Sequence, residues 1–370
     1  MLDRPKGGDR ALLVEIDFGQ GDLAERVEEL KSLALSAGAT VTEVMTARRA
    51  KPDPALFAGS GKVAEIAERR TMSGADIVIF DHALSGAQQR NLERVFDCRV
   101  VDRVSLILDI FAQRAQSAEG KLQVELAQLA HLSTRLVRGW THLERQTGGI
   151  GLRGPGETQL ESDRRLIGQR VKLLKDRLLH VGRQRETQRR ARRRAAVRNV
   201  ALVGYTNAGK STLFNRLTGA ETFAADQLFA TLDTTLRRLE VPGAEAIVVS
   251  DTVGFIKDLP HDLVAAFRGT LKEAVDADLL LHVIDASHPD REGQIGAVDA
   301  VLAEIGADDV PRIMVLNKCD IAEYLPGVER DEYGKIASVR LSALTGAGVP
   351  ELRAALAERF PRPVFRAATA

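Results

Sequence analysis

The stretch GYTNAGKST, Gly204 to Thr212, contains the pattern GxxxxGK[ST] and directly follows the apolar run Val200 to Val203. A helical pattern from Lys210 to Leu217 begins inside it. A strand, a glycine-bearing turn and a helix in this order predict a loop whose backbone N–H groups and helix N-terminus face phosphates. Lys210 would add a positive charge toward the phosphates, and the Ser211 hydroxyl would coordinate Mg²⁺.

Alternating strand and helix patterns continue after this loop. Such alternation predicts a doubly wound α/β sheet that binds its ligand at the carboxyl ends of the strands. The expected strands are Val200–Val203, Arg238–Val241, Ala246–Asp251, Leu279–Asp285, Arg312–Asn317 and Val339–Ser342.

Three short motifs follow the loop in the order and spacing of a GTPase. In DTVG, Asp251 would hold Mg²⁺ through water, and the Gly254 N–H would sense the γ-phosphate. In NKCD, the carboxylate of Asp320 can accept both N1–H and N2–H of guanine, whereas adenine offers no matching pair of donors. The motif SAL would support the base with backbone groups. These residues predict GTP rather than ATP.

The segment FATLDTTLRR lies between the phosphate loop and DTVG, where a switch segment closes over Mg²⁺ and the γ-phosphate. A threonine there completes the metal shell. Thr231 is favoured because it lies in the FATLD core, with Thr235 and then Thr234 as alternatives.

Phe255 follows DTVG at the position where Ras-like enzymes carry a water-orienting glutamine. An apolar side chain cannot orient water, so backbone, a partner or a monovalent cation must do so. One hypothesis is a K⁺ site at Asn207; the alternative for Asn207 is a hydrogen bond that stabilises the loop.

The site prediction therefore gives Lys210 and Asn207 catalytic roles, with Ser211 and Thr231 as ligands of Mg²⁺. The expected nucleotide-binding residues are Gly204, Tyr205, Thr206, Asn207, Ala208, Gly209, Lys210, Ser211, Phe229, Ala230, Thr231, Leu232, Asp233, Asp251, Thr252, Val253, Gly254, Asn317, Lys318, Cys319, Asp320, Ser342, Ala343 and Leu344.

The first 112 residues have the pattern of a separate α/β domain. The expected strands are Ala11–Phe18, Asp76–Phe80 and Arg99–Val101, with helices over Leu23–Ala37 and Lys62–Arg70. Within this region, LFAGSGK (Leu56 to Lys62) resembles a phosphate loop but lacks the full spacing, so a turn that caps a helix is the better interpretation.

Residues 113–197 form a predicted helical linker, folded as an antiparallel hairpin around a glycine-rich loop at 145–162. One apolar stripe consists of Leu122, Leu126, Leu129, Leu136, Trp140 and Leu143, and the other of Ile167, Val171, Leu174, Leu178 and Val181. These stripes could pair within one chain, between two chains, or against a neighbouring domain. Pairing within the chain is expected, which predicts a monomer.

Charge is unevenly distributed along the 370 residues, whose formal net charge is only +1. The segment Arg183 to Arg198 carries eight arginines and one glutamate, so it is either a binding surface for phosphate backbones or a solvated helix face. There is no run of about 18 apolar residues and no secretory signal pattern, which predicts a cytoplasmic protein without a membrane span.

Five segments together resemble the HflX family of ribosome-associated GTPases. They are DHALSGAQQRNLE (Asp81 to Glu93), VDRVSLILDIFAQRAQSAEGKLQVELAQL (Val101 to Leu129), GGIGLRGPGETQLESDRR (Gly148 to Arg165), GYTNAGKST and FATLD. One departure is Thr234, where many relatives have proline after FATLD, and it leaves the choice of switch threonine open.

The resemblance implies an N-terminal α/β domain, the helical linker, a P-loop GTPase domain at 198–362 and a tail at 363–370. It implies Mg²⁺ and GTP or GDP as ligands and the large ribosomal subunit with its rRNA as partner, near which the tip Gly148 to Glu157 would lie. Family members split stalled ribosomes under stress. For localisation, we expect a cytoplasmic protein that associates with ribosomes or the membrane surface. The alternatives are a checkpoint in large-subunit assembly and an RNA-remodelling factor whose N-terminal domain uses ATP.

Overall fold

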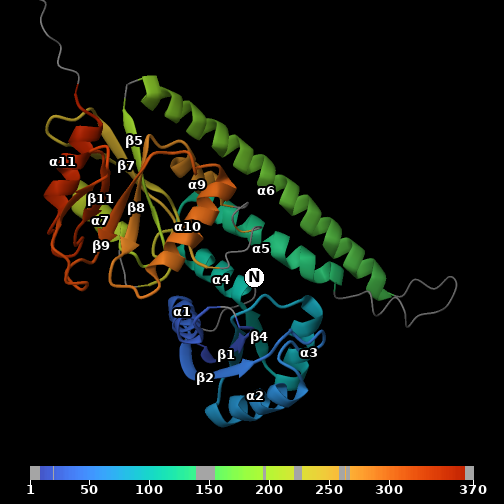
Figure 1. Ribbon diagram of the computed structural model, residues 1–370. Helices are drawn as coiled ribbons and strands as arrows, with labels where there is room; N and C mark the ends of the chain where they lie inside the picture. The colour runs from blue at the N-terminus through green and yellow to red at the C-terminus, as the bar shows by residue number, and fades with distance from the viewer. Residues whose placement is uncertain are drawn as a thin grey trace, which may run out of the picture. The chain divides into compact units, whose positions relative to one another are not determined.

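The computed structural model describes residues 9–19, 21–138, 155–194, 197–220, 227–257, 263 and 267–362. The chain divides into two compact units (Figure 1). The first comprises Met1–Gln113 and Lys121–Leu178, and the second comprises Arg114–Gly120 and Leu179–Ala370.

The first unit is built on a parallel four-stranded sheet in the order β2-β1-β3-β4. Its core is formed by apolar strand residues such as Val14 and Phe80 packed with Ile66 of α2 and Leu92 of α3. The elements are β1 (Arg10–Asp17), α1 (Leu23–Ser36), β2 (Thr40–Arg48), α2 (Ser60–Ser73), β3 (Ile77–Phe80), α3 (Gly86–Phe96), β4 (Arg99–Asp102) and α4 (Arg103–Arg114).

The three strands and two helices expected in this region are present. The structure adds β2, an edge strand whose residues are mostly half-buried, so its sequence lacks a long apolar run. The segment LFAGSGK forms a turn before α2, with Gly59 at the N-cap at φ 82°. The Arg49 guanidinium donates to the Ala58 carbonyl in this turn at 2.9 Å, which confirms the interpretation as a helix-capping turn.

The helices α5 (Ala118–Arg138) and α6 (Pro155–Arg194) form the expected hairpin and run antiparallel (Figure 1). Arg170 of α6 donates to Glu125 of α5 at 2.7 Å. The second apolar stripe is the least exposed face of α6, with Leu174 fully buried. Trp140 and Leu143, which were expected in the first stripe, lie outside the described residues.

One boundary within the linker differs from the sequence-based expectation. Helix α6 begins at Pro155, so residues 155–162 are helical rather than part of the glycine-rich loop; proline suits the first turn of a helix because its φ is preset and it needs no N–H partner there. The two compact units both include part of the predicted linker, with residues 121–178 in the first unit and residues 114–120 and 179–197 in the second. The first part of the linker is tied to β4 by an ion pair of 2.5 Å between Arg135 and Asp102.

The second unit contains a seven-stranded mixed sheet in the order β10-β11-β9-β8-β5-β7-β6. Helices α7 and α11 pack on one face through Phe214 and Leu352, while α9 and α10 contact each other and strands β5 and β8 (Figure 1). The elements are β5 (Arg198–Gly204), α7 (Lys210–Thr218), β6 (Thr235–Leu239), β7 (Ile247–Asp251), α9 (Arg268–Val275), β8 (Leu279–Asp285), α10 (Arg291–Ile305), β9 (Arg312–Asn317), β10 (Gly327–Arg330), β11 (Ile336–Arg340) and α11 (Val349–Arg359).

This sheet confirms the predicted α/β fold with a doubly wound sheet. Parallel strands β11, β9, β8, β5 and β7 place their carboxyl ends at one edge, and antiparallel β6 and β10 close the two sides. All six expected strands are present, although β6 begins at Thr235, before the expected Arg238. Strand β10, which has few buried residues, was not expected from the sequence.

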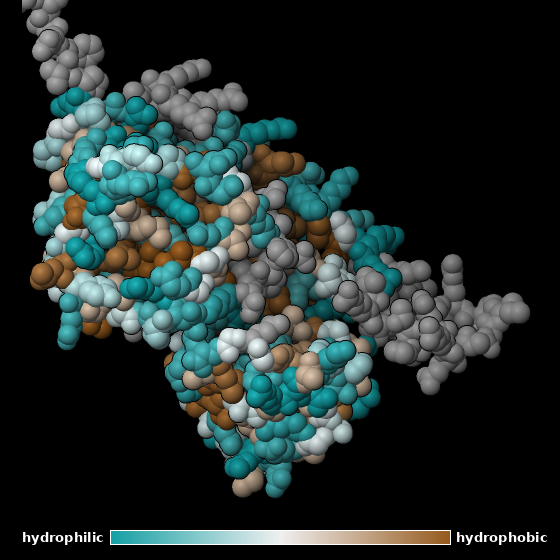
Figure 2. Space-filling model, in the orientation of Figure 1, coloured by the Kyte–Doolittle hydropathy of each residue, from teal (hydrophilic) through white to brown (hydrophobic). Residues whose placement is uncertain are grey.

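The surface seen in Figure 2 is mostly hydrophilic, with hydrophobic residues in separate small patches. The exposed large apolar residues come from several elements and include Leu179, Ile321, Leu325, Tyr333 and Leu344. Among the described helices, none combines the length and apolar character that crossing a membrane requires.

Strand β8 carries a histidine in the core of the second unit. His282 is only 1% exposed, and burial lowers the pKa of its imidazole from 6.5 to about 4. Because the unfolded chain takes up the proton first, this histidine favours the folded state above pH 6.5, and that contribution is lost as the pH falls toward 4. When the pH is lowered from 7.5 to 5, we expect the free energy of unfolding of the wild type to fall by about 2 kcal/mol more than that of His282→Met. Urea unfolding at the two pH values measures this difference.

The control for this comparison is His180→Met, because His180 is exposed on α6. It should follow the pH dependence of wild type. Equal pH dependence in wild type and His282→Met would contradict the assignment of a buried neutral imidazole.

Candidate nucleotide site

The predicted phosphate loop, the switch segment and DTVG meet at the carboxyl edge of the second sheet. Gly204 ends β5, the loop continues through Gly209, and α7 begins at Lys210. Together the segments enclose one pocket. It is lined by Thr206, Asn207, Gly209, Lys210, Ser211, Thr212, Gln227, Phe229, Ala230, Thr231, Thr252 and Gly254.

The Lys210 side chain is held beneath this loop by a backbone carbonyl of the loop. The Lys210 Nζ donates to the Tyr205 carbonyl at 2.7 Å, and the side chain is buried. Burial lowers the pKa of Lys210 to about 8, against the opposing attraction of the Asp251 carboxylate. Gly254 must lack a side chain, because a Cβ there would lie 2.9 Å from both the Lys210 Nζ and the Thr206 Cα. The loop thus brings one cation close to the Gly254 backbone.

Two hydroxyls and a carboxylate converge next to Lys210. The Ser211 Oγ lies 2.7 Å from the Thr231 Oγ1, and both donate to the Asp251 Oδ2, at 2.7 and 2.9 Å. The other carboxylate oxygen, Asp251 Oδ1, is buried and has no hydrogen-bond partner among the described residues. Mg²⁺ prefers such oxygen ligands, so this donor set fits the metal that P-loop GTPases generally hold with the nucleotide.

The three candidate threonines lie in different environments. Thr231 is the one whose hydroxyl meets Ser211 and Asp251. Thr235 begins β6 and pairs through its backbone with Asp251 in the antiparallel ladder. Thr234 lies between them, outside the residues that line the pocket.

The NKCD motif joins the phosphate loop to the SAL motif. The Asn317 Nδ2 donates to the Ala208 carbonyl at 2.8 Å, and its Oδ1 accepts from the Ala343 N–H at 2.9 Å. Gly209 makes room for this amide, because a Cβ there would lie 2.2 Å from the Asn317 Nδ2. Asp320 is exposed at the end of the motif, where its carboxylate is accessible to a base. Asn317 is therefore a buried connector.

Phe255 points into the core and is 1% exposed. Its backbone pairs with the loop, since its N–H donates to the Gly204 carbonyl at 3.1 Å and its carbonyl accepts from Thr206 at 2.7 Å. The Phe255 side chain thus fills the interior and leaves water positioning to other groups. Asn207 lines the pocket as an exposed residue at φ 60°.

Some expected binding residues have other surroundings. Leu232 is buried in the core at 1% exposure, and the Asp233 carboxylate accepts from the Ser117 N–H at 2.7 Å instead of lining the pocket. The sequence analysis also missed Gln227, which lines the pocket, and Arg216, which donates to the Ala343 carbonyl at 3.2 Å. Neither lies in a recognisable motif, so no local signal could have identified it.

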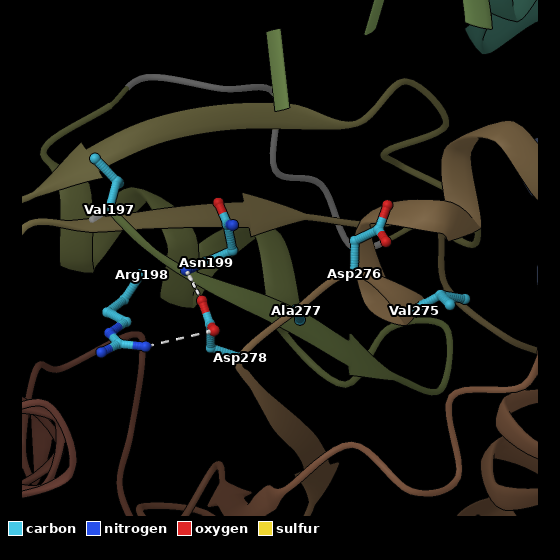
Figure 3. A pocket seen from close by; sticks show the side chains of 7 residues that line it. All are labelled: Val197, Arg198, Asn199, Val275, Asp276, Ala277 and Asp278. Atoms are coloured by element: carbon cyan, nitrogen blue, oxygen red, sulfur yellow. Dashed lines mark hydrogen bonds and ion pairs between the residues drawn. The ribbon is translucent and has the colours of Figure 1, made fainter. Parts of the chain in front are cut away.

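A cavity of about 480 Å³ lies elsewhere in the second unit, at the amino ends of β5 and β8 (Figure 3). Asp276 and Asp278 line it, while its cation, Arg198, is neutralised by Glu245 at 2.5 Å and by Asp278 at 3.8 Å. Carboxylates repel phosphate groups, so this larger cavity is unsuited to a nucleoside triphosphate.

Comparisons with known proteins agree with this geometry. Residues 24–112, 114–192 and 199–318 match family models described as GTP-binding GTPase N-terminal, GTP-binding GTPase Middle Region and 50S ribosome-binding GTPase. The GTPase HflX of Escherichia coli strain K12 is 58% identical over 97% of this chain and 85% of that protein. The chain belongs to the HflX family of GTPases. The GTPase HflX of Magnetococcus marinus is 46% identical over 99% of this chain and 85% of its own length.

The fold of this HflX-family chain is also similar to that of a solved protein. The crystal structure of SsGBP in complex with GDP aligns with 95% of this chain and 98% of that chain, at a TM-score of 0.52 and 24% identity. This likeness concerns the fold alone. It is membership of the HflX family of GTPases that makes the chain a GTP-binding protein and an enzyme that hydrolyses GTP. This confirms the resemblance and the nucleotide class expected from the sequence.

Proposed function

We propose that this protein is a GTP-controlled switch that binds the large ribosomal subunit through its rRNA and splits stalled ribosomes under stress. The observation that carries the proposal is the match of residues 199–318 to the 50S ribosome-binding GTPase model within an HflX-family chain. The arginine-rich end of α6 supports it, because its seven arginines from Arg183 to Arg194 can neutralise RNA phosphates.

In the proposed site, Lys210 binds the β- and γ-phosphates, and Ser211 and Thr231 hold Mg²⁺, with Asp251 reaching the metal through water. The support is the convergence of their oxygens within 2.9 Å and the buried Lys210 beside them. When bound, the metal neutralises charge that develops on the phosphates. Ordering of the Thr231 segment by the γ-phosphate would then distinguish the GTP state from the GDP state.

Asn207 is proposed as a K⁺ ligand that helps to replace the missing glutamine. Asn207 is exposed in the pocket, whereas the apolar side chain of Phe255 is buried and cannot orient water. A cation held by Asn207 would supply positive charge beside the phosphates in its place. The hydrolysis assay below, repeated in NaCl in place of KCl, tests it. Equal rates in the two salts would remove the K⁺ site.

The experiment that tests the proposed function is steady-state GTP hydrolysis by the purified protein, alone and with large subunits or whole ribosomes. Sucrose gradients in the same reactions report subunit separation. Stimulated hydrolysis together with GTP-dependent splitting supports ribosome rescue. Stimulation only by immature large subunits would favour the assembly checkpoint, and hydrolysis that ribosomes leave unchanged would contradict a ribosomal partner.

The arginine-rich segment gives a direct test of RNA contact. Reversal of Arg192, Arg193 and Arg194 to glutamate is expected to weaken ribosome binding at least about tenfold at physiological salt, because phosphate contacts dominate such affinities. GTP binding should be unchanged. The matched control reverses Lys172, Lys175 and Arg177, which are exposed on the same helix and change the net charge equally. Equal affinity of the two triple variants would argue against a local contact.

A further inference from the structure

Residues 228–233, which include the first half of the switch segment FATLDTTLRR, contact the rest of the second unit at several points. Leu228, Phe229 and Leu232 are buried, at 7%, 2% and 1% exposure. Between them, the Thr231 hydroxyl reaches Ser211 and Asp251. The apolar residues anchor the segment, while Thr231 faces the nucleotide pocket.

The last anchor is the carboxylate of Asp233. Its Oδ2 accepts from the backbone N–H groups of Gln116 and Ser117, at 2.8 and 2.7 Å, and its Oδ1 accepts from the Ser117 hydroxyl at 2.5 Å. The Ser117 Oγ in turn accepts from the Gly120 N–H at 2.8 Å. The donors to Asp233 lie in the two residues that precede α5, and Gly120 lies in its first turn; all belong to residues 114–120 of the second unit. A negative charge placed just before a helix N-terminus is stabilised by the helix dipole.

Gly120 makes this approach possible. A Cβ at residue 120 would lie 2.1 Å from the Asp233 Oδ1, which is far inside van der Waals contact. Within a helix, glycine is less favourable than alanine by about 1 kcal/mol. Gly120 therefore lowers the stability of α5 locally, but it leaves room for the Asp233 carboxylate.

We propose that Asp233 is a positioning residue for GTP hydrolysis, which holds Thr231 at the metal site by anchoring the switch segment to Gln116 and Ser117, immediately before α5. Only Leu232 separates Asp233 from Thr231, so their Cα atoms lie at most about 7 Å apart. Loss of the Asp233 anchor would free the Thr231 hydroxyl to leave Ser211 and Asp251. This inference rests on the proposed role of Thr231 but not on any ribosomal partner.

The contact between Asp233 and Ser117 also lets the bound nucleotide affect the residues before α5. If the γ-phosphate and Mg²⁺ order Thr231, they also favour the arrangement in which Asp233 accepts from Gln116 and Ser117, because coupling between two sites is reciprocal. The backbone of Gln116 and Ser117, just before α5, then reports the nucleotide state. Exchange of the Gln116 and Ser117 amide hydrogens should be about tenfold slower with a non-hydrolysable GTP analogue and Mg²⁺ than with GDP.

The test uses the full chain without ribosomes and compares Asp233→Ala, Gly120→Ala, Thr231→Ala and the control Asp308→Asn. Asp308 is exposed and distant in sequence from both segments. We expect Asp233→Ala and Gly120→Ala to lower kcat about tenfold, with KM for GTP changed less than about threefold, because Lys210 and Asp320 still bind the nucleotide. The nucleotide dependence of exchange at Gln116 and Ser117 should disappear in both variants.

Gly120→Ala keeps the proposal testable if Asp233→Ala folds poorly, since alanine favours the helix. Normal kcat in both variants, alongside a reduced kcat in Thr231→Ala, would overturn the inference alone. Normal kcat in Thr231→Ala would overturn the proposed role of Thr231 and the inference with it. Parallel losses of GDP binding and kcat in Asp233→Ala would mean a merely structural role and would also contradict the proposal.

Discussion

Replacement of Lys210 by alanine is expected to slow GTP hydrolysis at least about a hundredfold, because a preorganised charge at the phosphates is lost. Lys210 is the one cation among the described residues that line the pocket, so no neighbour can take its place. The fold should persist, since this buried ammonium is destabilised by its surroundings, as its lowered pKa of about 8 indicates. Single-turnover hydrolysis measures the effect, and circular dichroism checks the fold.

The matched control is Lys62→Ala in LFAGSGK, the segment that resembles a phosphate loop. Lys62 forms an exposed ion pair with Glu65 at 2.9 Å, and its turn is occupied by Arg49. We expect no loss of GTP hydrolysis in this variant. Hydrolysis that survives Lys210→Ala but fails in Lys62→Ala would contradict the assigned site. ATP-dependent RNA unwinding that survives Lys210→Ala would favour the RNA-remodelling alternative.

The Asp320→Asn variant is expected to bind GTP at least about a hundredfold more weakly and to prefer xanthosine triphosphate. An asparagine amide offers one acceptor and one donor, which suit the N1–H and the C2 carbonyl of xanthine rather than the two donors of guanine. The rest of the motif should stay in place, because Asn317 rather than Asp320 makes the connections to Ala208 and Ala343. Competition with labelled GDP measures both affinities.

Asp309→Asn is the control for this change, because Asp309 is exposed and lies outside the nucleotide motifs. It should bind GTP as wild type does. A variant Asp320→Asn that still prefers GTP would contradict the assignment of guanine recognition to this carboxylate.

The sequence predicted most of the sheet in the second unit because each core strand is a long apolar run followed by a turn motif. The two strands that the sequence analysis missed have a common cause. Strands β2 and β10 are edge strands with few buried residues, so their local pattern resembles a loop. The start of α6 was placed too late because the glycines around Pro155 suggested a loop, although proline is compatible with a helical first turn.

The sequence did not decide which of three threonines in the switch segment binds the metal. Their spacing along the chain is too similar for local pattern to separate them. The structure favours Thr231, whose hydroxyl lies 2.7 Å from the Ser211 Oγ, whereas Thr235 belongs to the β6 ladder. Asp233 was assigned to the nucleotide because it lies in FATLD, but its carboxylate faces α5.

The sequence by itself determined the phosphate loop, the guanine motif and the α/β class, because these depend on residues close together in the chain. Only the tertiary structure decided which side chains meet across long separations. Ser117 and Asp233 are 116 residues apart, and Asn317 reaches Ala208 over 109 residues. Such contacts follow from strand order and helix packing, and no local spacing of residue types encodes them.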